Sequence, residues 1–260
     1  MSRYDTYTSG ASFASPRITW AVQRLIFACT IVFALQLVAG PLQLLLFAGM
    51  PLTDLLMFEP GSFFLRGHLW SVFTYQFMHS GLLHLFMNML WLFFFGPEVE
   101  RVLGTRGFFK FYLVCGCVSV LATAIPFLLQ GSNPSVVGAS GAVMAVLVAF
   151  AMIDPQRQLY LFPIPFPITA LALVVIIAAL NLVSGLQESH VSVATHFGGM
   201  GAGYLYMKFL PQMNNWSRDW RRSRQVKPGR NKSTGTKPDL DKIGEEVDNI
   251  FKFRDHDKRR

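Results

Sequence analysis

The sequence predicts an all-α polytopic membrane protein, built as a bundle of six membrane-spanning helices. Of its 260 residues, 52% are hydrophobic and only 15% are charged, against about 25% charged in a typical soluble domain. The apolar residues gather in long runs, and Lys and Arg concentrate between alternate runs. This composition excludes a soluble globule, a disordered chain, a collagen-like fibre and a disulfide scaffold.

The six expected spans follow from the lengths of the apolar runs. A helix needs about 20 apolar residues to cross a bilayer, and fewer when other helices shield it. The expected spans are residues 18–39, 82–95, 108–129, 138–153, 168–183 and 191–210. Gly40-Pro41, Gly96-Pro97 and Pro211 are predicted to end three of them. The second and fourth spans are short, which predicts central helices buried by their neighbours.

The chain is expected to have three parts: a cytoplasmic N-terminal segment (1–17), a six-span domain (18–211) and a basic cytoplasmic tail (212–260). The start of the chain lacks the pattern of a cleaved signal peptide, so the first span is interpreted as a retained signal anchor. The tail follows a span directly, and its arginines are therefore expected to bind anionic lipid headgroups rather than nucleic acid. An amphipathic helix at 239–253 and a solvated tail without a specific role both remain open.

Positive charges predict the orientation of the chain. With the N-terminus in the cytoplasm, 22 of the 23 Lys and Arg residues fall on the cytoplasmic side, and only Arg66 falls outside. Cytoplasmic loops of membrane proteins carry such an excess of Lys and Arg. Both termini are therefore expected to be cytoplasmic. The connection at 41–78 is rich in Trp, Tyr and Phe and is expected to lie partly in the membrane interface.

Polar side chains within the spans are the candidates for function, because they are costly in a bilayer. There are few of them. They are His84 and Asn88 in the second span, with His79 and Ser80 just before it, Ser140 at the start of the fourth, Asn181 near the outer end of the fifth and His196 in the sixth. The three cysteines lie in apolar runs and are interpreted as small core residues.

Ser140 opens the fourth span within Gly138-Ala139-Ser140-Gly141. One interpretation is a simple N-cap. The glycines favour another, because Gly138 permits a tight turn and Gly141 adds no side chain to shield the hydroxyl. Amides at a helix start also face outward, ready to receive negative charge. These features are typical of an exposed nucleophile beside an oxyanion site.

His196 strengthens that interpretation. Small residues follow matching helical stripes, Gly199 and Gly203 in the sixth span and Gly141, Ala145 and Ala149 in the fourth. Such stripes allow two helices to approach closely. If they pack together, the imidazole of His196 comes within hydrogen-bonding reach of Ser140. A serine beside a histidine base is the minimum for nucleophilic catalysis.

His84 and Asn88 are four residues apart and share a helix face, where two hydrogen-bond donors would suit an oxyanion. A metal site formed by His79, His84 and His196 is the competing hypothesis. No span contains Asp, Glu or a well-placed thiolate to complete such a ligand set, so no metal and no other cofactor is expected. For the same reason no carboxylate orients His196, which predicts a catalytic dyad rather than a triad.

Four motifs in this order carry a family resemblance over about residues 70–206. They are His79 followed by His84-x-x-x-Asn88, then Gly96-x-x-x-Glu100-x-x-x-Gly104, Gly138-x-Ser140-Gly141, and His196 with Gly199 and Gly203. In these motifs and in topology the chain resembles the rhomboid intramembrane serine proteases.

The resemblance implies a rhomboid-like six-helix fold in the cell inner (plasma) membrane, with Ser140 as nucleophile and His196 as general base. His84, Asn88 and the Ser140 amide would form the oxyanion hole, and Glu100 would be a structural anchor. Substrates would be transmembrane proteins, cleaved in or near their membrane segments without nucleotide. The alternative is a non-catalytic relative that binds transmembrane helices.

Two positions depart from the family pattern. Met144 stands where an aromatic residue often packs on the catalytic histidine. Trp70-Ser71 stands where a Trp-Arg pair is often found in the first external loop. Neither change alters the residues assigned to the chemistry.

Overall fold

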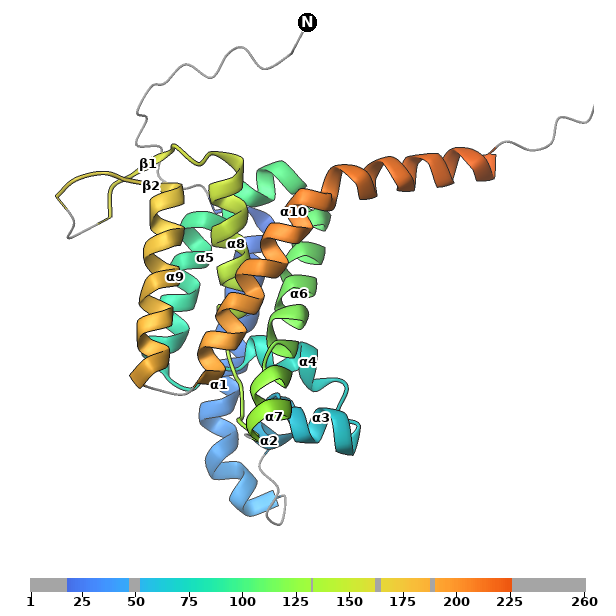
Figure 1. Ribbon diagram of the computed structural model, residues 1–260. Coiled ribbons are helices and arrows are strands. Elements are labelled where there is room, and N and C mark those ends of the chain that lie inside the picture. The colour runs from blue at the N-terminus through green and yellow to red at the C-terminus, as the bar shows by residue number, and fades with distance from the viewer. Residues whose placement is uncertain (1–17, 47–51, 132, 162–164, 188–189, 226–260) are drawn as a thin grey trace, which may run out of the picture. The chain divides into compact units, whose positions relative to one another are not determined.

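The computed structural model of the chain describes residues 18–46, 52–131, 133–161, 165–187 and 190–225, and within these ranges it is almost entirely helical (Figure 1). The longer helices are α1 (Trp20–Leu46), α5 (Leu82–Leu103), α6 (Thr105–Leu121), α8 (Ser140–Ile153), α9 (Ala170–Gln187) and α10 (His190–Gln225). The shorter helices are α2 (Leu52–Leu56), α3 (Pro60–Arg66), α4 (Ser71–Thr74), the 3-10 helix η1 (Tyr75–Phe77) and α7 (Ala124–Gln130). An antiparallel hairpin of β1 (Gln158–Leu159) and β2 (Ile168–Thr169) joins α8 to α9.

The chain divides into two compact units after Met213, a boundary that falls within α10. The first unit holds the membrane-spanning helices. Three stretches of the described residues are long and apolar enough to cross a membrane: Trp20–Val38, Leu82–Leu103 and Thr105–Leu129. Ser140–Ile153 and Ala170–Ser184 are shorter apolar helices. The fold is therefore a polytopic all-α membrane fold, as expected.

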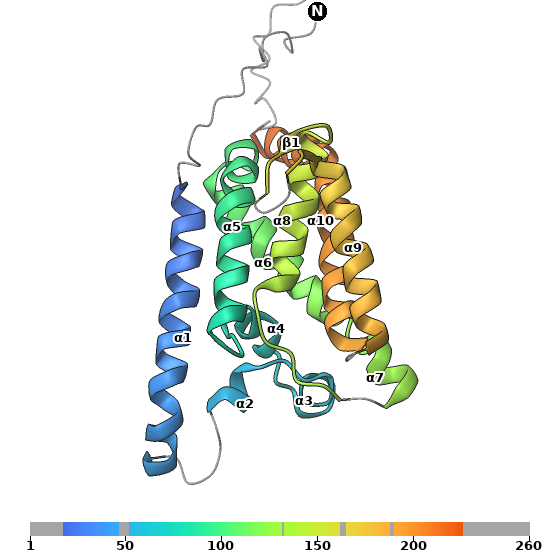
Figure 2. The same ribbon diagram turned by 90° about the vertical axis from the view of Figure 1, so that its left-hand side faces the viewer.

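Helix α8 is the centre of the first unit. Ten of its fourteen residues are buried, and it packs on α5, α6 and α9. Figure 2 shows α8 among its neighbours, reached by an extended stretch of chain. The helix predicted at 138–153 is thus short and buried, as expected. Since its neighbours shield it from lipid, α8 needs less than a full membrane-spanning length.

The predicted end of the second helix is wrong. Helix α5 continues through Gly96-Pro97 and ends at Leu103, so it is a full-length span of 22 residues. Both residues of the Gly-Pro pair are buried. A β-carbon at Gly96 would lie 2.6 Å from Val22 Cγ2 of α1. Close packing on α1 therefore holds the helix together where proline removes one backbone hydrogen bond.

Two other predicted helix ends also differ, and one predicted span is interrupted. Helix α1 continues through Gly40-Pro41 to Leu46, and α10 continues through Pro211. The predicted third span (108–129) lies within one apolar stretch, Thr105–Leu129, but its helix is interrupted at Ala122 and Thr123, between α6 and α7. The Thr123 hydroxyl donates to the Val120 carbonyl at 2.6 Å. Pro126 has no N–H for the carbonyl of Ala122, so the regular ladder cannot continue across this point.

Glu100 joins the starts of two helices to the end of α5. Its buried carboxylate accepts hydrogen bonds from the amides of Ala21 and Val22 at 3.0 and 3.1 Å. The hydroxyls of Thr19 and Thr105 also donate to it, at 2.5 and 2.8 Å. A negative charge here satisfies first-turn amides of α1 that have no partner within the helix. Glu100 is thus a structural anchor, as the resemblance implied.

Candidate active site

The turn before α8 depends on glycine at position 138. Gly138 has φ of +123°, a backbone conformation that residues with a side chain rarely adopt. A β-carbon there would also lie 2.7 Å from Cε1 of His84. The Gly138 amide donates to the Tyr75 carbonyl at 2.9 Å, and Val136 pairs with Phe58. The segment around η1 therefore holds the chain that leads into Ser140.

Ser140 is the first residue of α8 and is partly exposed. The first amides of a helix have no intrahelical partner, so their N–H groups at this end of α8 face the space in front of the helix. They carry the positive end of the helix dipole. Ser140 therefore lies at the positive end of the α8 dipole, a position that favours a nearby negative charge.

The two glycine stripes meet as predicted. A β-carbon at Gly199 of α10 would overlap the backbone carbonyl of Gly141 in α8. A β-carbon at Gly203 would lie 2.7 Å from the Cα of Ala145, one turn further along. The two helices are therefore in backbone contact, which only glycine allows at these positions.

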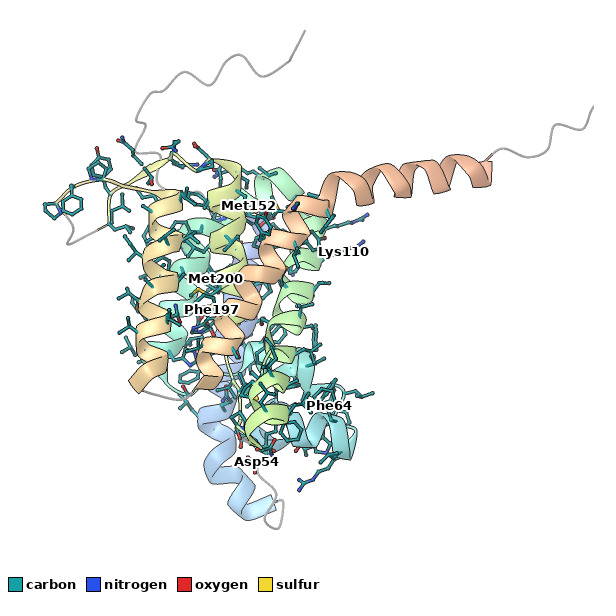
Figure 3. All side chains as sticks on the ribbon, in the orientation of Figure 1. Asp54, Phe64, Lys110, Met152, Phe197 and Met200 are labelled. Carbon is teal, nitrogen blue, oxygen red and sulfur yellow. The ribbon has the colours of Figure 1, made fainter. Side chains whose placement is uncertain are left out.

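This contact brings the histidine-bearing turn of α10 to the start of α8. Thr195 Cγ2 lies only 3.3 Å from where a Gly141 β-carbon would be. Met200 and Phe197, the α10 residues labelled in Figure 3, mark the same stretch of the helix. Ser140 and His196 both lie in the described ranges, and no direct hydrogen bond joins their side chains there. The hydrogen bond between a nucleophile and its base often tightens only in the complex with substrate.

Gly141 is required for a reason that the sequence did not reveal. A β-carbon at this position would collide with the Ser119 hydroxyl of α6. That hydroxyl lies 2.9 Å from the Tyr75 hydroxyl, and the Tyr75 hydroxyl also donates to the Gly116 carbonyl at 2.6 Å. Burial raises the pKa of Tyr75, which keeps the phenol neutral and able to donate. Gly141 thus makes room for a polar network under the start of α8.

His84 of α5 faces the turn before Ser140. Its Nε2 lies 2.9 Å from where a Gly138 β-carbon would be, and its Nδ1 lies 2.9 Å from the Ser80 hydroxyl. Asn88 is buried one turn along α5, and its Nδ2 donates to the His84 carbonyl at 2.9 Å. A carboxamide nitrogen carries a second N–H, which this bond does not use. Both candidate oxyanion residues therefore lie on the helix beside the start of α8.

The ring of His79 packs against the ring of His84. It is buried, and its ring meets the His84 ring edge-on at 5.3 Å between centroids. Its amide donates to Gln36 Oε1 at 3.1 Å, and Gln36 Nε2 donates back to the His79 carbonyl at 3.2 Å. Burial and the neighbouring His84 ring lower the pKa of His79 to about 4, so the ring is neutral at pH 7.

The sequence did not identify the partner of His196. Its Nδ1 is hydrogen-bonded to Oδ1 of Asn181 in α9, and Asn181 Nδ2 donates to the Ile177 carbonyl at 2.8 Å. Asn181 stood out only as a polar residue in an apolar span. The His84 ring is also close enough to His196 to interact with it electrostatically. Among the residues that the structure describes, no three His, Cys, Asp or Glu side chains form a group that could hold a metal.

The chain was also compared with models of known protein families. The model of the Rhomboid domain matches residues 66–212, from the end of α3 into α10. The match covers more than half of the chain and includes every candidate site residue from His79 to Gly203. The chain belongs to the rhomboid family.

Proposed function

We propose that this rhomboid is a catalytically active intramembrane serine endopeptidase. Ser140 is its nucleophile and His196 its general base. The observation that carries the proposal is the backbone contact of Gly199 with Gly141. These glycines lie next to Ser140 and His196 on their helices, so the contact brings the two helix segments together. Gly141 directly follows Ser140, and Gly199 lies one helical turn after His196.

In the proposed reaction the Ser140 oxygen attacks the carbonyl carbon of the scissile peptide bond while His196 accepts the hydroxyl proton. The carbonyl oxygen becomes an oxyanion, which the Ser140 amide, the His84 ring and the free N–H of Asn88 stabilise. His196 then protonates the leaving amine as the C–N bond breaks. A water molecule, deprotonated by His196, hydrolyses the acyl-enzyme and returns Ser140 to its free form.

The oxyanion role of His84 requires a proton on its Nε2. The Ser80 hydroxyl lies beside the other ring nitrogen, Nδ1, at 2.9 Å. When Ser80 donates to Nδ1, the neutral ring carries its proton on Nε2, the nitrogen that faces the turn before Ser140. The bond from Asn88 to the His84 carbonyl then holds the second donor on the same face of α5.

The proposed substrates are other transmembrane proteins, in a membrane whose lipids surround the bundle. A substrate helix must unwind locally, because an intact helix keeps its carbonyls hydrogen-bonded and shielded. We therefore expect cleavage near Gly, Pro or polar residues, with a small residue at the scissile bond.

The proposed location is the inner (plasma) membrane of the cell. Both termini are proposed to lie in the cytoplasm. Basic residues support this orientation, since Arg101 and Arg157 both approach Glu98, at 2.7 and 3.5 Å, at the end of α5. Figure 3 shows Lys110 and Met152 toward this end of the first unit, and Asp54 and Phe64 toward the other. Water would then reach Ser140 from the external side.

Substitution of the nucleophile tests the proposal. The protein is reconstituted in liposomes with a fluorescent transmembrane reporter, and cleavage by Ser140→Ala is compared with wild type. Ser184→Ala, which changes an exposed serine of α9, is the matched control. We expect no cleavage by Ser140→Ala and wild-type cleavage by the control. Undiminished turnover by Ser140→Ala contradicts the proposal. Reporter binding without cleavage by the wild type favours a non-catalytic helix-binding rhomboid.

A further inference from the structure

The polar pair formed by Asn181 and His196 lies in an otherwise apolar part of the bundle. Asn181 is on α9 and His196 is on α10, and both side chains are partly buried. No Asp or Glu occurs in α8, in α9 or in residues 190–210 of α10. No carboxylate of these helices is therefore available to orient the histidine, and the carboxamide of Asn181 takes that position.

The hydrogen bonds of Asn181 fix which way its carboxamide faces. The Ile177 carbonyl is only an acceptor, so the group 2.8 Å from it must be the amide nitrogen, Nδ2. The carboxamide oxygen, Oδ1, then faces Nδ1 of His196. Because Oδ1 is only an acceptor, Nδ1 of the histidine must carry a proton.

The tautomer of His196 follows from this assignment. A neutral imidazole has one protonated and one unprotonated nitrogen, so a proton on Nδ1 leaves Nε2 with a free lone pair. That lone pair is what a general base needs to accept the proton of a serine hydroxyl. In the proposed reaction the hydroxyl that this lone pair serves is that of Ser140 on α8.

We propose that Asn181 is a positioning residue that holds His196 in the Nδ1–H tautomer, with Nε2 free to serve Ser140. The inference rests on the proposed function, and it replaces the dyad expected from the sequence with a Ser-His-Asn arrangement. A carboxamide performs the same orienting role in Cys-His-Asn proteases. It does so here without placing a negative charge inside the membrane, where an ionised carboxylate would be costly.

Two substitutions separate orientation from folding. Asn181→Leu keeps the number and branching of the side-chain heavy atoms in an apolar helix but removes the acceptor oxygen. Asn181→Asp restores an acceptor oxygen. Since Asn181 does not contact the substrate in this scheme, we expect Asn181→Leu to lower kcat about 10- to 100-fold with KM unchanged. Asn181→Asp is expected to recover most of the lost kcat, and Ser184→Ala to match wild type.

A spectroscopic measurement reports the tautomer directly. Protein labelled with ¹⁵N-histidine is examined by NMR in detergent, and the His196 signals are assigned by comparison with His196→Ala. We expect a protonated Nδ1 and an unprotonated Nε2 in wild type and in Asn181→Asp. In Asn181→Leu the proton is expected to move toward Nε2. A merely structural role for Asn181 would leave the tautomer unchanged.

The outcomes distinguish this inference from the proposed function. Wild-type kcat in Asn181→Leu, or an unchanged tautomer, overturns the positioning role while an inactive Ser140→Ala still supports the protease. Equal losses in Asn181→Leu and Asn181→Asp also overturn it, because the acceptor oxygen would then be irrelevant. Full cleavage by Ser140→Ala overturns the proposed function itself.

Discussion

The Gly199 Cα and the Gly141 carbonyl belong to different helices, yet they are so close that no β-carbon fits at position 199. This contact of α10 with α8 is the structural basis of the proposed site. Helix pairs in membranes lack a strong hydrophobic driving force, so such close packing of small residues is what holds them together.

Gly199→Ala is therefore expected to destabilise the bundle by about 1–3 kcal/mol and to reduce cleavage strongly, because the new methyl group must push α10 away from α8. Thermal unfolding in detergent and reporter cleavage measure the two effects. Gly201→Ala is the matched control, since a β-carbon at Gly201 meets nothing within 4 Å. Equal effects of the two substitutions would show that the close contact has no special role.

Asn88→Ala tests the oxyanion hole. The variant is expected to fold and to cleave the reporter about 30- to 300-fold more slowly, because one donor to the oxyanion is lost. Asn133→Ala serves as control, since it removes an exposed carboxamide whose Oδ1 accepts a hydrogen bond from the Gly61 amide rather than from a residue of the proposed site. Wild-type kcat in a folded Asn88→Ala protein would remove Asn88 from the site.

Glu100→Ala is expected to lower the free energy of unfolding by about 2–3 kcal/mol, because the amides of Ala21 and Val22 lose a charged acceptor. Glu98→Ala removes a neighbouring carboxylate whose ion pair with Arg101 is half-exposed, and such pairs are worth at most about 1 kcal/mol. Unfolding by denaturant compares the two. A loss no larger in Glu100→Ala than in Glu98→Ala would show that the anchor contributes little.

The sequence predicted the packing of α8 on α10 well. The spacing of Gly199 and Gly203 can be read within one helix, and the matching stripe of small residues can be read within α8 alone. Helix ends were predicted poorly. Pro97 would end a helix in water, but its burial against α1 depends on tertiary packing that no local pattern contains.

Some site residues could be predicted from local sequence patterns, whereas the roles of others depend on tertiary packing. Ser140 and His196 stood out because each is polar in an apolar segment and has glycines at informative spacings. The roles of Asn181 and Ser119 depend on how α9 and α6 are rotated about their axes. Rotation is set by contacts with several neighbours at once, so the pairing of Asn181 with His196 became visible only in three dimensions.

The most direct test of the central claim is covalent labelling of the folded protein by a serine-directed fluorophosphonate probe, with the modified residue located by mass spectrometry. We expect labelling of wild type at Ser140 and almost none in His196→Ala, since an isolated serine hydroxyl is a poor nucleophile. Labelling of Ser140 that persists undiminished in His196→Ala, or labelling at other serines alone, would contradict it.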